Sequence, residues 1–187
     1  RHSSTPIETL DYSYNVRGWM TGLNKELANS SNAMNRWFSM ELSYDYGFEQ
    51  RQYGGNISGI KWRSRGDDNR RAYGFGYDLA NRILYADFNQ ANGTIWDKSA
   101  GVNFTSLMGN NGVDADQAYD ENGNIRRMQQ WGIKGVGSTQ VDGLSYHYMT
   151  KSNKLRNVLE DQGINDTDTK LGDFRVSSRH LAVTPNR

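Results

Sequence analysis

Cysteine is absent from the 187-residue sequence, which excludes a disulfide framework and metal sites built on thiolates. Proline is nearly absent, because only Pro6 and Pro185 occur, one near each end, and nearly every internal residue can therefore donate to a β-ladder. No stretch approaches the roughly 18 apolar residues that a membrane-spanning helix needs. The net charge is +1, without the basic excess of nucleic-acid-binding proteins. We expect no membrane span and no nucleic-acid partner.

Aliphatic residues are also scarce. Ile, Leu, Val and Phe make up about 18% of the chain, which would favour disorder if the net charge were high, but it is not. Eleven tyrosines and five tryptophans supply the missing apolar area, since each aromatic side chain can bury roughly 150–250 Å². A chain of this length is typical of one domain. The sequence therefore predicts a single folded unit over residues 1–187, with a core built from aromatics.

The aromatics follow a repeated pattern. Four runs place an apolar residue and two aromatics on alternate positions: "LDYSYN" (10–15), "LSYDYG" (42–47), "YGFGYD" (73–78) and "LSYHYM" (144–149). A period of two is that of a strand with one buried face, and tyrosine and phenylalanine pack well on a pleated surface. We predict strands here, with Tyr12, Tyr44, Phe75 and Tyr146 on the buried side.

Polar clusters that follow the tyrosines predict the turns of β-hairpins, since Asn, Asp and Gly tolerate left-handed backbone and bond their own main chain. The copy at Tyr46 is distorted by the insertion "GFEQRQYGGN" before Ile57 resumes the pattern. The four regular clusters are "NVRGWM" after Tyr14, "DLANRI" after Tyr77, "DENGNI" after Tyr119 and the one-longer "MTKSNKL" after Tyr148.

The strand–turn–strand units predict a mainly β fold of consecutive antiparallel hairpins in one twisted, extended sheet, with a short helix or loop inserted. A second kind of hairpin would place Ile60 and Trp62 opposite Tyr73 and Phe75. Helical spacing leaves open whether residues 25–38 and 125–131 are helical. The expected repeats cover roughly 10–40, 40–64, 71–100, 115–135 and 141–160, followed by an atypical tail, 161–187, whose last part, 176–187, has no assigned role.

A tyrosine, then Asp or Asn, a polar spacer, Gly or Asn and an apolar residue together resemble the YD repeat of bacterial RHS-type proteins; "YDENGNI", "YDLANRI" and "YNVRGWM" carry the resemblance. In that family the repeats form successive hairpins of a long sheet, which in large members encloses a C-terminal cargo such as a toxin. The family's self-cleaving members carry a proline- and aspartate-containing core motif that nothing in 163–187 matches. The resemblance implies signature tyrosines Tyr14, Tyr77, Tyr119 and Tyr148 and turn residues Gly18, Asn81, Gly123 and Asn153.

The resemblance also implies a place in a larger protein. Position 1 is Arg rather than Met, and a closed shell needs more hairpins than these, so we expect a segment of a longer chain or a small family member. The implied location is the cell surface or the secreted fraction. The partners expected are other repeats of the parent chain, a cargo or toxin domain, a glycan, and further copies of this chain through unpaired sheet edges.

Catalytic and metal-binding patterns are thin, so we expect no enzyme, no cofactor and no metal. The loop "YDENGN" suggests a calcium site, but an EF-hand counted from Asp120 would have Ile125 at its sixth position and Trp131 at its twelfth, where Gly and Glu are needed. The other candidate residues are better explained as solvated surface groups than as catalytic or metal-binding groups. They are His2, His147, His180, the pair Glu41 and Asp45, and the group Asp114, Asp116 and Asp120.

Three functions remain, and the third is a hydrolase whose site the sequence does not reveal. The repeats favour a non-enzymatic structural segment of a shell or scaffold. The alternative is a carbohydrate-binding surface module, because exposed aromatic faces stack on sugar rings. The side chains that would do so are Trp19, Trp37, Trp62, Trp96 and Trp131.

Overall fold

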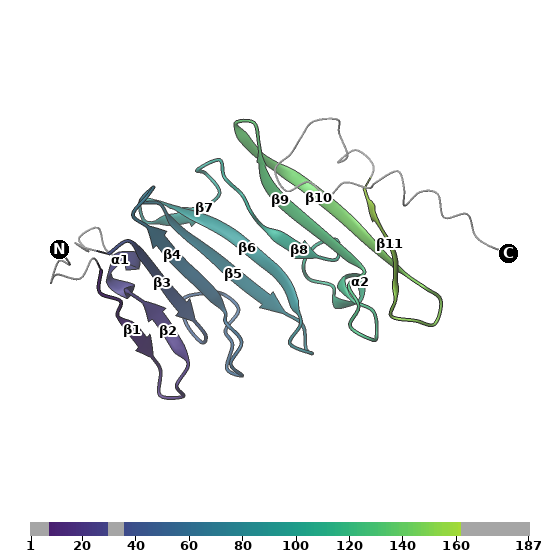
Figure 1. The fold of residues 1–187 in the computed structure, drawn as a ribbon, viewed down its shortest axis with the longest axis horizontal. Helices are drawn as coiled ribbons and strands as arrows, with labels where there is room; N and C mark the ends of the chain where they lie inside the picture. Colours follow the sequence, from purple (N-terminus) through teal and green to yellow (C-terminus); the bar gives the residue numbers. More distant parts are fainter. Residues whose placement is uncertain (1–7, 30–35, 162–187) are drawn as a thin grey trace, which may run out of the picture. The chain divides into compact units, whose positions relative to one another are not determined.

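A computed structural model describes residues 8–29 and 36–161 of the chain. Within these residues the fold is mainly β, and every strand pair is antiparallel. The prediction of consecutive antiparallel hairpins in one sheet is confirmed (Figure 1). The strands are β1 (Tyr12–Tyr14), β2 (Met20–Leu23), β3 (Phe38–Ser43), β4 (Gly59–Ser64), β5 (Arg70–Tyr77), β6 (Ile83–Asn92), β7 (Ile95–Asp97), β8 (Ser106–Met108), β9 (Arg127–Lys134), β10 (Gly137–Tyr148) and β11 (Leu155–Glu160).

Strand order follows chain order from β1 to β11, except that β7 pairs with β6 and stands off this path. Among the described strands the sheet does not close on itself, and β1 and β11 stand at the two ends of the strand order. Backbone contacts divide the chain into two compact units. The first holds the described residues up to Gly76 together with Asp87–Ala100, and the second holds Tyr77–Ala86 with the described residues from Gly101 onward.

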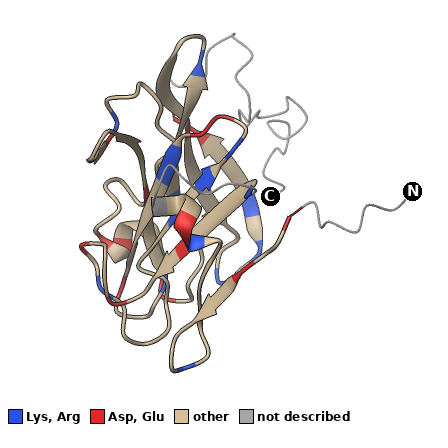
Figure 2. Ribbon diagram, turned by 90° about the vertical axis from the view of Figure 1, so that its left-hand side faces the viewer, with Lys and Arg blue, Asp and Glu red and all other residues tan. Residues whose placement is uncertain are grey.

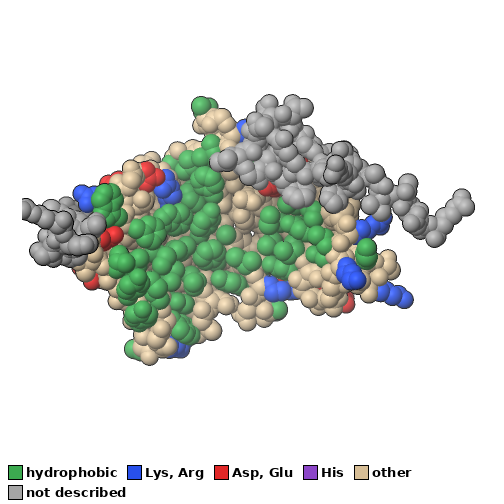
Figure 3. Space-filling model, in the orientation of Figure 1, with side chains coloured by type: hydrophobic (Ala, Val, Ile, Leu, Met, Phe, Trp, Pro, Cys, Tyr) green, Lys and Arg blue, Asp and Glu red, His purple; other side chains and the backbone are tan. Residues whose placement is uncertain are grey.

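The first unit has a core of stacked aromatics. Ile60 of β4 lies opposite Tyr73 of β5, as predicted, but Trp62 lies opposite Arg71 rather than Phe75, because the strands are antiparallel and their pairs diverge from Ile60 and Tyr73. The Tyr73 ring stacks on Trp62 at 5.5 Å and on Phe75 at 6.1 Å between centroids, and meets the edge of Phe88 at 5.4 Å. Phe88 is only 1% exposed. Figure 3 shows hydrophobic side chains gathered over the strands of this unit.

The long insertion between β3 and β4 contacts the sheet through one aromatic side chain. The ring of Phe48 lies against the glycines Gly59 of β4 and Gly74 of β5, which have no side chains to hold it off. Glycine weakens a strand when nothing packs on it, and an aromatic ring that covers the gap offsets this cost. The insertion that distorts the second repeat is therefore fixed to the sheet by Phe48.

This packing predicts that Gly59→Ala destabilises the protein. A Cβ at Gly59 would overlap the Phe48 ring, and overpacking of this kind costs about 1–3 kcal/mol. Urea unfolding of the variant should show that loss. Gly54→Ala is the matched control, because a Cβ there meets nothing within 4 Å. Equal stability of the two variants would contradict the packing.

The second unit has a smaller core in which Leu84, Ala118 and Tyr119 are buried. Ala118 ends the short helix α2 (Ala115–Ala118), which the sequence did not predict. Strands β9 and β10 form the longest hairpin of the unit, with Gly137 opposite Lys134 and a bulge between Gln140 and Asp142. None of the described helices is long and apolar enough to cross a membrane.

Both open assignments are answered in part. A five-residue helix, α1 (Lys25–Asn29), begins the first stretch, whose residues 30–35 lie outside the described residues, and β3 begins at Phe38. The second stretch is not helical: Ile125 bridges to Tyr119, and β9 begins at Arg127 and pairs with β10. His2, His180 and residues 162–187 of the expected tail also lie outside the described residues.

Candidate functional site

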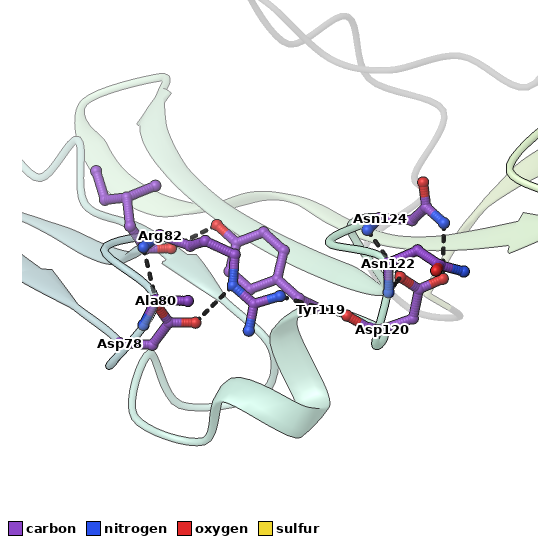
Figure 4. A network of polar contacts seen from close by, with 8 residues as sticks. Asp78, Ala80, Arg82, Tyr119, Asp120, Asn122 and Asn124 are labelled. Carbon is purple, nitrogen blue, oxygen red and sulfur yellow. Dashed lines mark hydrogen bonds and ion pairs between the residues drawn. The ribbon is translucent and has the colours of Figure 1, made fainter.

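The loop "YDENGN" is a turn in which an aspartate holds the main chain. The Asp120 Oδ1 atom accepts hydrogen bonds from the backbone N–H groups of Asn122 at 2.9 Å and Asn124 at 2.8 Å, and Oδ2 accepts from Asn124 Nδ2 at 2.7 Å (Figure 4). Gly123 supplies the positive φ of 83° that the turn needs. The carboxylate is thus occupied by the turn. The described residues contain no group of three or more His, Asp or Glu side chains arranged to hold a metal ion.

The same turn occurs twice more. Each copy has an Asn or Asp directly after the signature tyrosine, whose Oδ1 accepts from the second and fourth residues beyond it, and each has a left-handed residue third after it. Asn15 accepts from the N–H groups of Arg17 and Trp19 at 2.9 and 3.0 Å, with Gly18 at φ 77°. Asp78 accepts from Ala80 and Arg82 at 2.9 and 2.8 Å, with Asn81 at φ 61°.

The fourth turn differs from the prediction. The left-handed residue is Lys151, with φ 56°, rather than Asn153. Met149 stands where the other copies have Asn or Asp, so the Asn or Asp oxygen of the other turns is missing. Ser152 Oγ accepts from the Lys154 N–H at 3.1 Å, and the one-residue-longer loop closes through the main chain of Met149, Ser152 and Lys154. Asn153 instead accepts a hydrogen bond from Asn124 Nδ2 at 3.0 Å, which joins the fourth turn to the third.

Two tyrosine hydroxyls link their copies to the copy before. Tyr119 donates to the main-chain carbonyl of Ile83 at 2.5 Å, and Tyr148 donates to that of Ile125 at 2.9 Å. Each acceptor is the apolar residue that ends the preceding turn, six positions after the tyrosine of its own copy. We call this contact the interlock.

A third interlock corrects the sequence interpretation of the second copy. Tyr44 donates to the carbonyl of Met20 at 2.8 Å, and Met20 lies six positions after Tyr14. Tyr44 is 7% exposed, whereas Tyr46, which the sequence pattern emphasised, is 40% exposed and bonds to Glu41 at 3.2 Å. The signal was present, because Tyr44 and Asp45 are themselves a Tyr-Asp pair.

Arg82 joins two copies through its guanidinium. Its Nε donates to Asp78 Oδ2 at 2.6 Å within its own turn, and its Nη1 lies 3.3 Å from the carbonyl oxygen of Asp120 in the next turn. Between them the guanidinium lies over the Tyr119 ring, 4.5 Å from its centroid, as Figure 4 shows. Burial raises the pKa of Tyr119, and also of Tyr44 and Tyr148, so these hydroxyls remain protonated donors at neutral pH.

The turn aspartates make stability depend on pH. For Asp78, burial acts to raise the pKa, but hydrogen bonds from Arg82 and Ala80 outweigh it and hold the pKa below the ordinary value of 3.8. The bond from Asn124 likewise lowers the pKa of Asp120. A lowered folded-state pKa gives stability that is present above pH 3.8 and is lost as the pH falls through the folded-state value.

We therefore expect the free energy of unfolding to fall as the pH is lowered below 3.8. Asp78→Asn with Asp120→Asn should flatten this fall while preserving the turns, because Asn15 makes the same contacts with an amide. Urea unfolding from pH 5 to 2 measures the slope. A residual slope from Asp67 and Asp97, whose pKa values are also lowered, is expected. An unchanged slope in the double variant would contradict this role.

The five candidate tryptophans do not form one exposed row. Trp37 is 56% exposed and lies under the Arg65 guanidinium. The other four are half-buried: Trp19 beside Tyr44 at 5.1 Å, Trp62 on Tyr73, Trp96 near Lys61 and Arg70, and Trp131 in β9.

The remaining candidates have ordinary surroundings. Glu41 is 9% exposed and pairs with Lys25 at 3.7 Å, while Asp45 is exposed. His147 is exposed on β10 and lines an open hollow with Arg126 and Arg156. Of the acidic group, Asp114 accepts from Asn111 Nδ2 at 2.8 Å, and Asp116 lies in α2, where its carbonyl accepts from Arg126 at 3.2 Å.

Comparison with known proteins gives no further support. The chain matches no family model, no curated protein and no solved structure. The resemblance to YD repeats therefore rests on its own residues and stays a prediction.

Proposed function

We propose that this chain is a non-enzymatic structural segment of a larger secreted or cell-surface bacterial protein of the RHS type, in which its hairpins form part of a sheet-built shell or scaffold. Its partners are then the neighbouring repeats of the parent chain and a cargo, such as a toxin domain, held by the assembled sheet. The proposal concerns architecture, so the residues that matter are those that join one hairpin to the next.

The interlock is the observation that carries the proposal. Three times, at Tyr44, Tyr119 and Tyr148, a hydroxyl reaches the main chain of the preceding copy. In a repeat protein each unit contacts its neighbours, and stability comes from the interfaces between units. A tyrosine hydroxyl that bonds to a carbonyl of the preceding copy, at the same place in these three copies, is a feature of such an array.

The turn residues support the same function. The carboxylates of Asp78 and Asp120 each accept hydrogen bonds from two backbone N–H groups of their own turn. Arg82 spans from one turn to the next. These polar groups therefore fix backbone geometry and spacing between hairpins, which is what a scaffold requires.

Limited proteolysis and a glycan array together test this function against the carbohydrate-binding alternative. A structural segment should resist thermolysin within residues 36–161, because cleavage there needs local opening, and should retain no glycan. Trp37→Ala is the informative variant for the array, since Trp37 is the most exposed of the candidate tryptophans. Selective glycan binding that Trp37→Ala abolishes, or rapid cleavage inside the strands, would contradict the proposal.

A further inference from the structure

The series of interlocks is open at its N-terminal end. Tyr14 precedes its turn as Tyr119 precedes Asp120, yet its hydroxyl has no hydrogen-bond partner among the described residues. Tyr14 is 61% exposed, whereas the interlocking Tyr44 and Tyr119 are each 7% exposed. Tyr12 beside it is 54% exposed, against the expectation of a buried face, because β1 has only β2 as a partner.

The series is open at its C-terminal end as well. Strand pairing sets Tyr14 opposite Met20, Tyr119 opposite Ile125 and Tyr148 opposite Leu155. Met20 and Ile125 each accept the hydroxyl of the next tyrosine. Leu155 holds the same position in the last strand and is 50% exposed, but the sequence contains no tyrosine after Tyr148. Among the described residues, no tyrosine hydroxyl reaches the Leu155 carbonyl.

We propose that the two ends fit one another, so that β1 of one molecule pairs antiparallel with β11 of a second copy and Tyr14 of the first donates to the Leu155 carbonyl of the second. This partner rests on the proposed structural function, because in the chain as given a second copy takes the place that the neighbouring repeats hold in the parent protein. An outermost strand carries unpaired backbone groups that accept such an added strand.

The register of the inner interfaces predicts the contacts. Pairing of Leu23 with Met40 and Gly22 with Glu41, continued along both strands, brings the residue before Tyr44 opposite Met20. The same register at the ends sets Leu155 opposite Ser13, Arg156 opposite Tyr12 and Val158 opposite Leu10. An aliphatic pair and an arginine over an exposed tyrosine are both favourable across strands.

Charge at the two ends favours this contact on balance. The stretch that leads into β1 carries Glu8 and Asp11, the second of which pairs with Arg36, and Figure 2 shows red residues there. The register sets Glu8 opposite Glu160, and this like-charge pair reduces the gain. The start of β11 is basic, with Lys154 and Arg156 exposed. Opposite charges on the two ends favour head-to-tail contact over contact between two like ends. A head-to-tail dimer still has one free β1 end and one free β11 end, so further copies can add to it and form chains.

Sedimentation equilibrium of the full chain, from about 5 μM to about 1 mM, tests the proposal. We expect dimers followed by longer species as concentration rises. Tyr14→Phe should weaken association about fivefold, the effect of one net hydrogen bond. Tyr53→Phe is the matched control, because Tyr53 is 63% exposed and lies outside β1, and it should leave association unchanged.

Mixing two weakened variants gives the sharper readout. Tyr12→Lys places a positive charge against Arg156 at the β1 end, while Arg156→Glu removes the cation that lies over Tyr12 at the β11 end. Each alone should associate more weakly than the wild type, and an equimolar mixture should regain the longer species, because the lysine introduced at position 12 then faces the glutamate introduced at position 156. A monomeric wild type at about 1 mM, or equal effects of Tyr14→Phe and Tyr53→Phe, would overturn the proposal. Neither result bears on the interlocks inside the chain, which the proposed function requires.

Discussion

Replacing Tyr119 with alanine is expected to lower the free energy of unfolding by about 3–5 kcal/mol, the usual cost of deleting a buried aromatic side chain. Tyr119 is 7% exposed and packs with Leu84 and Ala118 in the core of the second unit. The Arg82 guanidinium also lies over the Tyr119 ring, and the Tyr119 hydroxyl donates a hydrogen bond to the Ile83 carbonyl. One substitution therefore removes packing, a cation–π contact and an interlock together.

Tyr119→Phe separates these contributions. It keeps the ring and removes only the hydroxyl, so the expected loss is about 1 kcal/mol. Urea unfolding followed by tryptophan fluorescence measures both variants, with Tyr53→Phe as an exposed control that should cost nothing measurable. If Tyr119→Ala costs no more than Tyr119→Phe, the ring is not packed as described, and if Tyr119→Phe is neutral, the interlock adds no stability.

Phe88→Ala should cost about 3–5 kcal/mol in the first unit. Phe88 is 1% exposed and touches both Trp62, at 6.2 Å between centroids, and Tyr73, at 5.4 Å. Aromatic pairs of this kind add about 0.5–1.5 kcal/mol beyond their buried area. The substitution would also remove the packing contact that Phe88 makes with the rings of Trp62 and Tyr73.

The matched control is Phe38→Ala, since Phe38 belongs to the same unit but is 40% exposed. Phe88→Leu should fall between the two, because it retains apolar volume without the ring. Denaturant unfolding gives the free energies, and amide exchange of β4 and β5 should report faster local opening in Phe88→Ala. Comparable losses for Phe88→Ala and Phe38→Ala would contradict an aromatic core centred on Phe88.

The hairpins and their turns were predictable because their signals are local. Alternating aromatics mark strands whatever their partners, and Asp120 with Gly123 marks a turn through contacts within five residues. The interlocks were not predictable, since they join residues 23 to 36 positions apart. Sequence spacing shows which tyrosines recur but not what their hydroxyls reach.

The misassigned positions have local causes. Asn153 aligns with the turn residue Gly123 in the sequence, but in the longer fourth loop the left-handed residue is Lys151. The sequence pattern favours Tyr46 over Tyr44, because the insertion that follows hides the spacing. Tyr12 was expected to be buried, which holds for an inner strand but not for β1 at the sheet edge.

The candidate chemistry was harder to judge from sequence. Asp120 looked like a metal ligand because a turn and a calcium loop both place oxygens on alternate residues, and only the N–H groups that it accepts distinguish them. The tryptophans looked equally able to stack on a sugar. Their exposure depends on neighbouring strands, such as Tyr73 beside Trp62, that a single strand's pattern does not reveal.

The most direct measurement of the central claim, that one tyrosine-to-carbonyl contact joins successive hairpins, is the free energy of unfolding of four Tyr→Phe variants compared in dilute solution. Tyr44→Phe, Tyr119→Phe and Tyr148→Phe should each lose about 0.5–1.5 kcal/mol, because each removes one interlock. Tyr14→Phe should lose nothing, because its hydroxyl has no partner among the described residues of the same molecule. Equal losses at all four positions, or none at the three interlocks, would contradict the account.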